Sequence, residues 1–251
     1  MCHSTDSRPP AVENPGSVAE EGLIELTSED GTPFSAFHAR PGEPNGRGVV
    51  ILPDIRGVHA YYQELARRFA EAGFAAVVLD YYGRTAGLGP RDDEFEWQPH
   101  FQQLVPDSVA ADARAAVAFL TERNPGITVF SVGFCLGGGH SWRLAGTDLE
   151  LAGSIGFYGL PGLVEDRLTD ISAPLLLLLA GDDVATTQED FAAFRGKLDE
   201  AGKPYEYKVY DGAPHSFFDG GSPEWKDISA DAWQRLLDFT ARHARDAEPA
   251  V

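Results

Sequence analysis

Residues 127–139 read ITVFSVGFCLGGG, an apolar run that leads into a cysteine flanked by glycines. The run is short and continuously apolar, which is typical of a strand covered on both faces of a sheet. The residues that follow, GGGHSWRLAG, indicate a helix. Gly133 and Gly137 permit the crowded turn that joins such a strand to a helix, and this turn lifts the side chain of Cys135 above the sheet. The stretch therefore predicts a nucleophile elbow.

Similar apolar runs lie before and after this stretch, and segments with apolar residues at helical spacing separate most of them. The expected strands are 48–53, 75–82, 127–133, 152–158, 174–181 and 205–210, and the expected helices are 61–73, 107–123, 189–202 and 232–245. Two further strands, 22–28 and 34–40, surround the turn EDGTP and predict an antiparallel hairpin. The pattern predicts an α/β fold with a mostly parallel central sheet, helices on both faces and ligands at the carboxyl ends of the strands.

The chain of 251 residues fits one domain, because single cores stop growing only beyond this length. Residues 1–19 are rich in Pro, Ser and Glu and lack an apolar period, which predicts a mobile tail. The domain is expected over residues 20–246 and a short C-terminal tail over 247–251. Residues 83–106 form a long acidic and aromatic loop that is placed to cover a pocket.

The composition argues against several classes of partner. A net charge of −19 would repel nucleic acids and anionic membranes. Neither a membrane span nor a signal peptide is visible, so we expect a cytoplasmic protein. Two cysteines, Cys2 and Cys135, suggest no disulfide framework, and the absence of zinc-type spacings predicts neither a metal nor another cofactor. The expected partner is a small molecule, with the chain a monomer or a weak homo-oligomer.

A cysteine nucleophile needs a base and a group that orients the base. On a fold of this kind the chain order is nucleophile, acid, histidine. Asp182 and Asp183 follow the strand 174–181, and His215 follows the strand 205–210, so both loops leave the carboxyl edge of the sheet. Asp183 is the preferred acid, but spacing alone does not separate it from Asp182. The competing interpretation of Cys135 is a buried small hydrophobic residue in a glycine-rich turn.

The oxyanion formed during such chemistry needs two amide donors. One is expected from Leu136, directly after the cysteine, and the other from Ile55 in the turn after strand 48–53, because Pro53 has no amide hydrogen. In the same turn, Asp54 places a carboxylate beside the thiol.

The motifs LPDIRGV, DYYGR, GFCLGGG, AGDD and GAPHSFF occur in this order, and together they resemble the dienelactone hydrolase family of α/β-hydrolases from about Gly22 to the last helix. The resemblance implies a Cys135, His215, Asp183 triad, with Ile55 and Leu136 as oxyanion donors. It also implies opening of an unsaturated cyclic lactone, carboxymethylenebutenolide, in the degradation of aromatic compounds.

Two positions depart from the family pattern. Asp54 stands where the family places a longer glutamate that controls the resting thiol. Of two family arginines that bind the substrate carboxylate, Arg84 matches the first, whereas Phe218 and Asp219 occupy the region of the second. An acidic Asp219 would oppose an anionic substrate unless Arg56 compensates.

Further residues are candidates for the pocket. Tyr82 and Tyr158 are expected to line it or to belong to the core. Arg84 has a second interpretation as a surface residue paired with Asp92 or Asp93. Among the other histidines, those closest to the predicted site are His140, on the helix after the elbow, and His59, near the rim. The remaining four are expected to be solvated or structural, namely His3, His38, His100 and His243.

The sequence thus predicts a carboxylic ester hydrolase that acts on an activated ester or lactone through an acyl-thioester. One alternative is a general carboxylesterase or thioesterase for neutral substrates, which the missing second arginine favours. The other is a non-catalytic protein that uses Cys135 for ligand capture or redox sensing.

Overall fold

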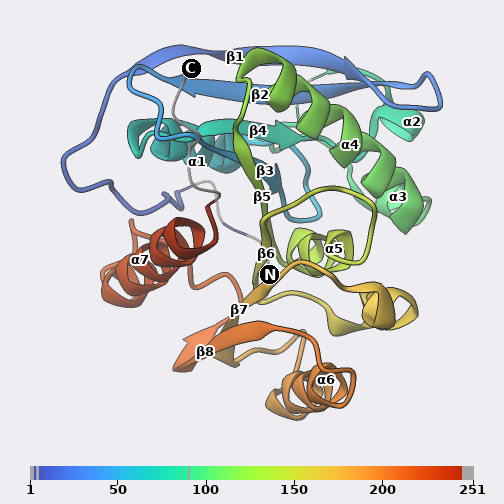
Figure 1. Cartoon of the computed structure of the whole chain (residues 1–251), viewed down its shortest axis with the longest axis vertical. Coiled ribbons are helices and arrows are strands. Elements are labelled where there is room, and N and C mark those ends of the chain that lie inside the picture. The colour runs from blue at the N-terminus through green and yellow to red at the C-terminus, as the bar shows by residue number, and fades with distance from the viewer. Residues whose placement is uncertain (1–2, 4–5, 90, 245–251) are drawn as a thin grey trace.

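The computed structural model describes residue 3, residues 6–89 and residues 91–244 (Figure 1). The strands are β1 Val18–Thr27, β2 Pro33–Pro41, β3 Arg47–Leu52, β4 Ala75–Leu79, β5 Thr128–Phe134, β6 Gly153–Phe157, β7 Leu175–Asp182 and β8 Tyr205–Pro214. The helices are α1 Ala60–Glu71, α2 Gly83–Ala86, α3 Gln98–Phe101, α4 Pro106–Arg123, α5 Leu136–Leu144, α6 Gln188–Glu200 and α7 Lys226–His243, with short 3₁₀ turns η1 Pro161–Leu163 and η2 Glu165–Asp170.

The strands form one sheet in the order β1-β2-β4-β3-β5-β6-β7-β8. β1, β2 and β4 pair antiparallel, and every pair from β4 onward through β3 to β8 is parallel. This arrangement confirms the predicted mostly parallel sheet with an antiparallel N-terminal hairpin. Because parallel strands run the same way, the ends of β3, β5, β7 and β8 bring their loops to one edge.

Helices cover both faces of the sheet (Figure 1). Strand residues alternate between the two faces, so that in β3 Val49 and Ile51 face one core whereas Val50 and Leu52 face the other. The first core includes residues of α1 and α7, and the second includes residues of α4 and α5. α6 packs with Trp142 of α5 in a third cluster. Strands buried on both faces explain why their sequences are continuously apolar rather than alternating.

The N-terminal segment contains no helix or strand among its described residues before Val18, yet it packs against the domain. His3, Ser7, Pro9 and Pro10 are buried. These contacts are made by single side chains that produce no periodic pattern in the sequence, and the mobility that we predicted for residues 1–19 stays a prediction. The predicted C-terminal tail, 247–251, lies outside the described residues.

The long loop after β4 contains the short helices α2 and α3. Two of its aromatic rings pack on a buried tyrosine: Phe95 stacks on His100 with 5.3 Å between ring centroids, and both rings contact Tyr82. Across the described residues, no helix combines the length and the apolar character needed to cross a membrane.

Candidate active site

Cys135 lies between β5 and α5, at the turn predicted to be an elbow. Its backbone has φ 55° and ψ −117°, which is an uncommon conformation for a residue with a side chain. The flanking glycines are required by close backbone contacts. A Cβ on Gly133 would lie 1.9 Å from the carbonyl oxygen of Gly137, and a Cβ on Gly137 would lie 2.0 Å from that of Leu52. The turn therefore cannot form with larger residues at these two positions.

His215 and Asp183 come together at the same edge, from the loops after β8 and β7. His215 Nδ1 lies 2.9 Å from both carboxylate oxygens of Asp183, and both side chains are almost completely shielded from solvent. The side chain of Cys135 forms a hydrogen bond with His215. Asp182, by contrast, is exposed at the end of β7. Of the two adjacent aspartates, the one in contact with the histidine is Asp183.

The protonation of His215 is decided by competing effects. Burial opposes a positive charge on the ring, but the hydrogen bonds and charges of Asp183 and Cys135 outweigh it and raise the pKa of His215 to about 9. The buried carboxylate holds the Nδ1 proton, so that Nε2 is the nitrogen that remains for other partners. This arrangement favours a positively charged imidazolium at His215.

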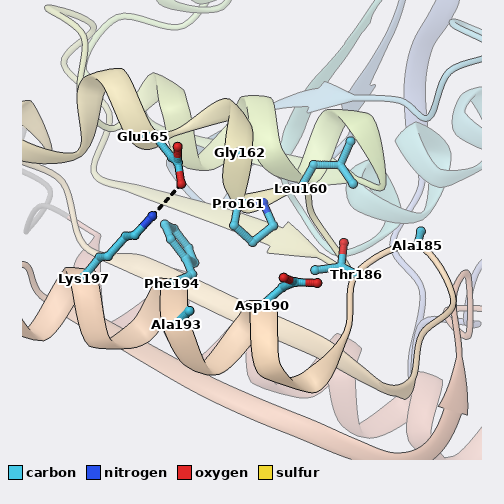
Figure 2. Close-up of a pocket in the computed structure, with 10 residues that line it drawn as sticks. All are labelled: Leu160, Pro161, Gly162, Glu165, Ala185, Thr186, Asp190, Ala193, Phe194 and Lys197. Carbon is cyan, nitrogen blue, oxygen red and sulfur yellow. Dashed lines mark hydrogen bonds and ion pairs between the residues drawn. The ribbon is translucent and has the colours of Figure 1, made fainter.

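The loop that carries Asp183 is held by its own backbone. The amides of Ala185 and Thr186 donate to Asp183 Oδ1, at 2.8 and 3.2 Å. The same two residues line a pocket of about 350 Å³ between η1 and α6. Figure 2 shows that the ion pair of Lys197 and Glu165 lies at the opposite end of this pocket from Thr186. The pocket thus borders the acid loop, and Cys135 is not among its lining residues.

The expected oxyanion donors lie where the elbow meets the turn after β3. Leu136 is the first residue of α5, so its amide has no acceptor within the helix. The turn with Ile55 is held by two neighbouring tyrosines. Tyr81 donates its hydroxyl to the Pro53 carbonyl at 2.7 Å, and Tyr82 donates to the Ile55 carbonyl. Tyr82 is fully buried, so its direct contact is with the turn that carries Ile55.

Asp54 lies buried in the same turn. Its Oδ1 accepts the Arg56 amide at 2.8 Å and lies 3.5 Å from His59 Nε2, whereas its Oδ2 has no hydrogen-bond partner among the described residues. Burial disfavours the charged carboxylate, but His59 and Arg56 outweigh burial and lower the pKa of Asp54 to about 2. Both Asp54 and Cys135 act electrostatically on Tyr81, so the two groups share this neighbourhood.

Arg84 forms ion pairs with two acidic residues on other elements. Its Nη1 lies 2.7 and 2.9 Å from the oxygens of Asp112 on α4, and its Nε lies 2.9 Å from Asp30 in the β1–β2 turn. The partners differ from Asp92 and Asp93, which the sequence suggested. Asp112 is buried, and burial raises its pKa even though Arg84 acts in the opposite direction.

Tyr158 contacts two histidines, His215 and His3. The ring of Tyr158 lies 4.8 Å from that of His215, and its hydroxyl lies 3.0 Å from Nε2 of His3. Of the two roles expected for His3, solvated or structural, the structure agrees with the second, because His3 is 3% exposed and stacks on Tyr61 with 3.8 Å between centroids. No sequence signal distinguishes His3, because an isolated histidine in a polar segment has no pattern that indicates burial.

The other histidines lie outside this contact network, except His59 beside Asp54. His140 is buried on α5, with its ring 6.0 Å from that of Tyr81, and burial together with Arg143 lowers its pKa to about 4. His38, His100 and His243 pack on phenylalanines elsewhere. Within the described ranges, no three His, Cys, Asp or Glu side chains are grouped so that they could hold a metal ion.

Comparison with known proteins places the chain in a family. The dienelactone hydrolase family matches residues 34–244. A protein of Escherichia coli K12 named "Putative carboxymethylenebutenolidase" is 30% identical over 242 residues, which cover 91% of this chain and 89% of that protein. A Bradyrhizobium protein named "Probable 2-oxo-3-(5-oxofuran-2-ylidene)propanoate lactonase" is 28% identical, with 83% and 89% covered.

The fold agrees with this assignment. The crystal structure titled "Putative Dienelactone Hydrolase" from Klebsiella pneumoniae superposes with a TM-score of 0.74 and 26% identity, covering 88% of this chain and 99% of that one. The chain therefore belongs to the dienelactone hydrolase family of the α/β-hydrolase superfamily and is a carboxylic ester hydrolase.

Proposed function

We propose that the protein hydrolyses activated esters or lactones, of the carboxymethylenebutenolidase type, through a thioester formed on Cys135. The observation that carries this proposal is the hydrogen-bonded series Asp183, His215, Cys135 at one edge of the sheet. A thiol of purely structural importance does not need a buried histidine oriented by a buried carboxylate. The names of the Escherichia coli and Bradyrhizobium relatives point to the same chemistry.

In the first half of the reaction the Cys135 thiolate attacks the substrate carbonyl carbon, and the carbonyl electron pair moves to oxygen. The amides of Leu136 and Ile55 stabilise the resulting oxyanion. When the carbonyl re-forms, the carbon–oxygen bond of the ester breaks, and the His215 imidazolium protonates the departing oxygen. The product of this half-reaction is an acyl-thioester on Cys135.

In the second half His215, now neutral, removes a proton from water, and the resulting hydroxide attacks the thioester. The Cys135 thiolate departs and the carboxylic acid is released. Asp183 keeps the imidazole in one tautomer throughout. Asp54 adds negative charge near the thiol, and we assign to it the control of the resting thiol.

The nucleophile sets the reactivity required of the substrate. A thiolate leaves a tetrahedral intermediate more easily than an alkoxide, so hydrolysis is productive when the alcohol is itself a good leaving group, as in enol lactones and aryl esters. Simple alkyl esters are poor substrates on this mechanism.

A second candidate function is hydrolysis of neutral esters or thioesters. The ion pairs of Arg84 with Asp112 and Asp30 favour it, because they occupy the donors that a substrate carboxylate would use. Asp219, beyond His215, adds negative charge. A panel of aryl and enol esters with and without a carboxylate separates the two functions by the ratio of kcat/KM values.

The test is replacement of the thiol. Cys135→Ala should lower hydrolysis of p-nitrophenyl acetate and of an enol lactone by at least about 10³-fold, because the nucleophile is lost while the fold is retained. Cys2→Ala, which changes the other cysteine, is the matched control and should leave the rate unchanged. Mass spectrometry of the wild-type enzyme during turnover should detect an acyl group on Cys135.

Full activity of the Cys135→Ala enzyme would refute the assignment of the nucleophile. Stoichiometric acylation of Cys135 without turnover would instead support a protein that captures ligands rather than hydrolysing them.

A further inference from the structure

His3 lies between the catalytic histidine and a separate pocket. On one side it is hydrogen-bonded to Tyr158, whose ring contacts His215. On the other side its ring stacks on Tyr61, with planes inclined by only 13°, and its carbonyl accepts a hydrogen bond from Arg56. Tyr61 and Arg56 both line a pocket of about 570 Å³. One side chain thus contacts both the surroundings of the catalytic histidine and the lining of this pocket.

This pocket has a basic lining, although the chain as a whole carries a charge of −19. We call it the arginine-lined pocket, because five arginines contribute to it together with three acidic residues: Arg8, Arg56, Arg67, Arg68 and Arg91 with Glu64, Asp92 and Asp93. Several of the arginines are already engaged, such as Arg91 by Asp80. Arg56 Nε, however, lies 3.7 Å from Asp54 and has no hydrogen-bond acceptor among the residues described.

The N-terminal segment that carries His3 is also fastened on the other side of the site. The amide of Arg8 donates to Asp219 Oδ1 at 3.0 Å, and the carbonyl of Arg8 accepts from the Gly220 amide at 2.8 Å. Gly220 has no room for a side chain, because a Cβ there would lie 2.7 Å from Pro10. The segment is therefore fitted to the loop that follows His215, as well as to the turn that follows β3.

We propose that His3 is a specificity-determining residue of this hydrolase. Its ring lies between Tyr158, which contacts His215, and Tyr61, which lines the arginine-lined pocket, and in this position it restricts the site to compact acyl groups. Without the ring, the site extends into the arginine-lined pocket and accepts long groups that end in a carboxylate. This inference rests on the proposed function for its meaning in catalysis, but the geometry can be tested without turnover.

The first experiment measures access to the Cys135 thiol in a full-length Cys2→Ser background, where Cys135 is the sole cysteine. Iodoacetamide serves as the compact reagent and a dianionic bis(nitrobenzoate) disulfide as the bulky acidic one. In His3→Gly, the rate with the disulfide should rise about tenfold relative to the rate with iodoacetamide. The ratio of the two rates removes any effect of the variant on the acidity of the thiol, because both reagents react with the thiolate.

Three further variants distinguish the effect of the side-chain size at position 3 from the effect of the Arg56 charge and from general disruption of the fold. His3→Phe keeps an aromatic ring without the hydrogen bond to Tyr158, and it should retain the wild-type ratio. Arg56→Gln added to His3→Gly should remove most of the gain for the dianionic disulfide, because the group that receives the acid is lost. His243→Ala, on α7 and outside this network, should leave the ratio unchanged.

The second experiment uses turnover. For p-nitrophenyl esters, His3→Gly should lower the KM for an acyl chain with a terminal carboxylate without lowering the KM for the acetate, a selective change that a merely structural role would not produce. Equal changes for both thiol reagents, or a His3→Phe variant that behaves like His3→Gly, would overturn the role of His3. The two proposals can fail separately. If Cys135→Ala retained hydrolysis while the labelling ratios followed the expectation, the assignment of Cys135 as the nucleophile would be refuted, and the role of His3 in limiting access to the site would still be supported.

Discussion

His215 and His3 are two buried histidines that contact the same tyrosine, yet their surroundings favour different charge states. Both are less than a tenth exposed, and Tyr158 lies between them. Burial lowers the pKa of both rings. At His215 a buried carboxylate and the thiol outweigh burial and raise the pKa to about 9, whereas at His3 burial prevails and lowers the pKa to about 3.

The difference teaches that a carboxylate partner can outweigh burial and keep a histidine charged, whereas a phenol partner does not. The ring nitrogen of His215 has a carboxylate at 2.9 Å, and that of His3 has a neutral phenol at 3.0 Å. The ring of His215 is therefore favoured in its protonated form and the ring of His3 in its neutral form.

Asp183→Asn should have the largest effect on the difference between the two histidines, because it removes the carboxylate partner of His215. The amide cannot hold the required tautomer or stabilise the imidazolium, so kcat for activated esters should fall by about three to four orders of magnitude. Steady-state kinetics measures this effect, with Asp182→Asn on the neighbouring exposed residue as the control. A loss of less than about tenfold would show that Asp183 does not orient the base.

Arg84→Ala extends the comparison to a cation with one buried acidic partner, Asp112, and one exposed partner, Asp30. Removing Arg84 leaves Asp112 buried without its bidentate partner, and the free energy of unfolding should fall by about 3 kcal/mol. Chemical denaturation measures this loss, and Arg40→Ala, which breaks an exposed pair with Glu20, should cost less than about 1 kcal/mol.

The same variant tests the predicted contact of Arg84 with substrate. If Arg84 binds a substrate carboxylate, KM should rise for acidic esters while neutral esters are unaffected. Equal effects on both kinds of ester would leave Arg84 with a role in stability alone.

The pH dependence of stability should show the two histidines acting with opposite sign. The raised pKa of His215 contributes stability that is complete below about pH 6.5 and is lost as pH rises toward 9, which amounts to about 2 kcal/mol between pH 5.5 and 8.5. The lowered pKa of His3 acts in reverse, because the unfolded chain binds a proton that the folded chain does not, and stability falls by about 1 kcal/mol as pH drops from 8.5 to 5.5.

Urea denaturation at the two pH values, on His215→Gln and His3→Phe, measures the two contributions. Replacing His215 should cost more stability at pH 5.5 than at pH 8.5, and His3→Phe should be more favourable, relative to the wild type, at pH 5.5. The same sign for both variants would contradict the assignment of charge.

The central elements were predictable because they depend on local pattern. Strands buried on both faces must be apolar throughout, and the elbow at Cys135 needs glycines because backbone atoms lie within about 2 Å of where their side chains would be. The loops after β7 and β8 were predictable as neighbours, since parallel strands end at one edge. These rules relate residues through their strands and need no knowledge of individual side-chain contacts.

The sequence by itself determined the fold class, the elbow and the set of loops that meet at its edge. Tertiary structure decided which of two adjacent aspartates contacts His215, which acids engage Arg84, and that His3 lies beside Tyr158. The physical reason is one of range: apolar period and turn chemistry act between neighbours along the chain, whereas hydrogen bonds and ion pairs depend on side-chain directions that are set only when distant segments pack together.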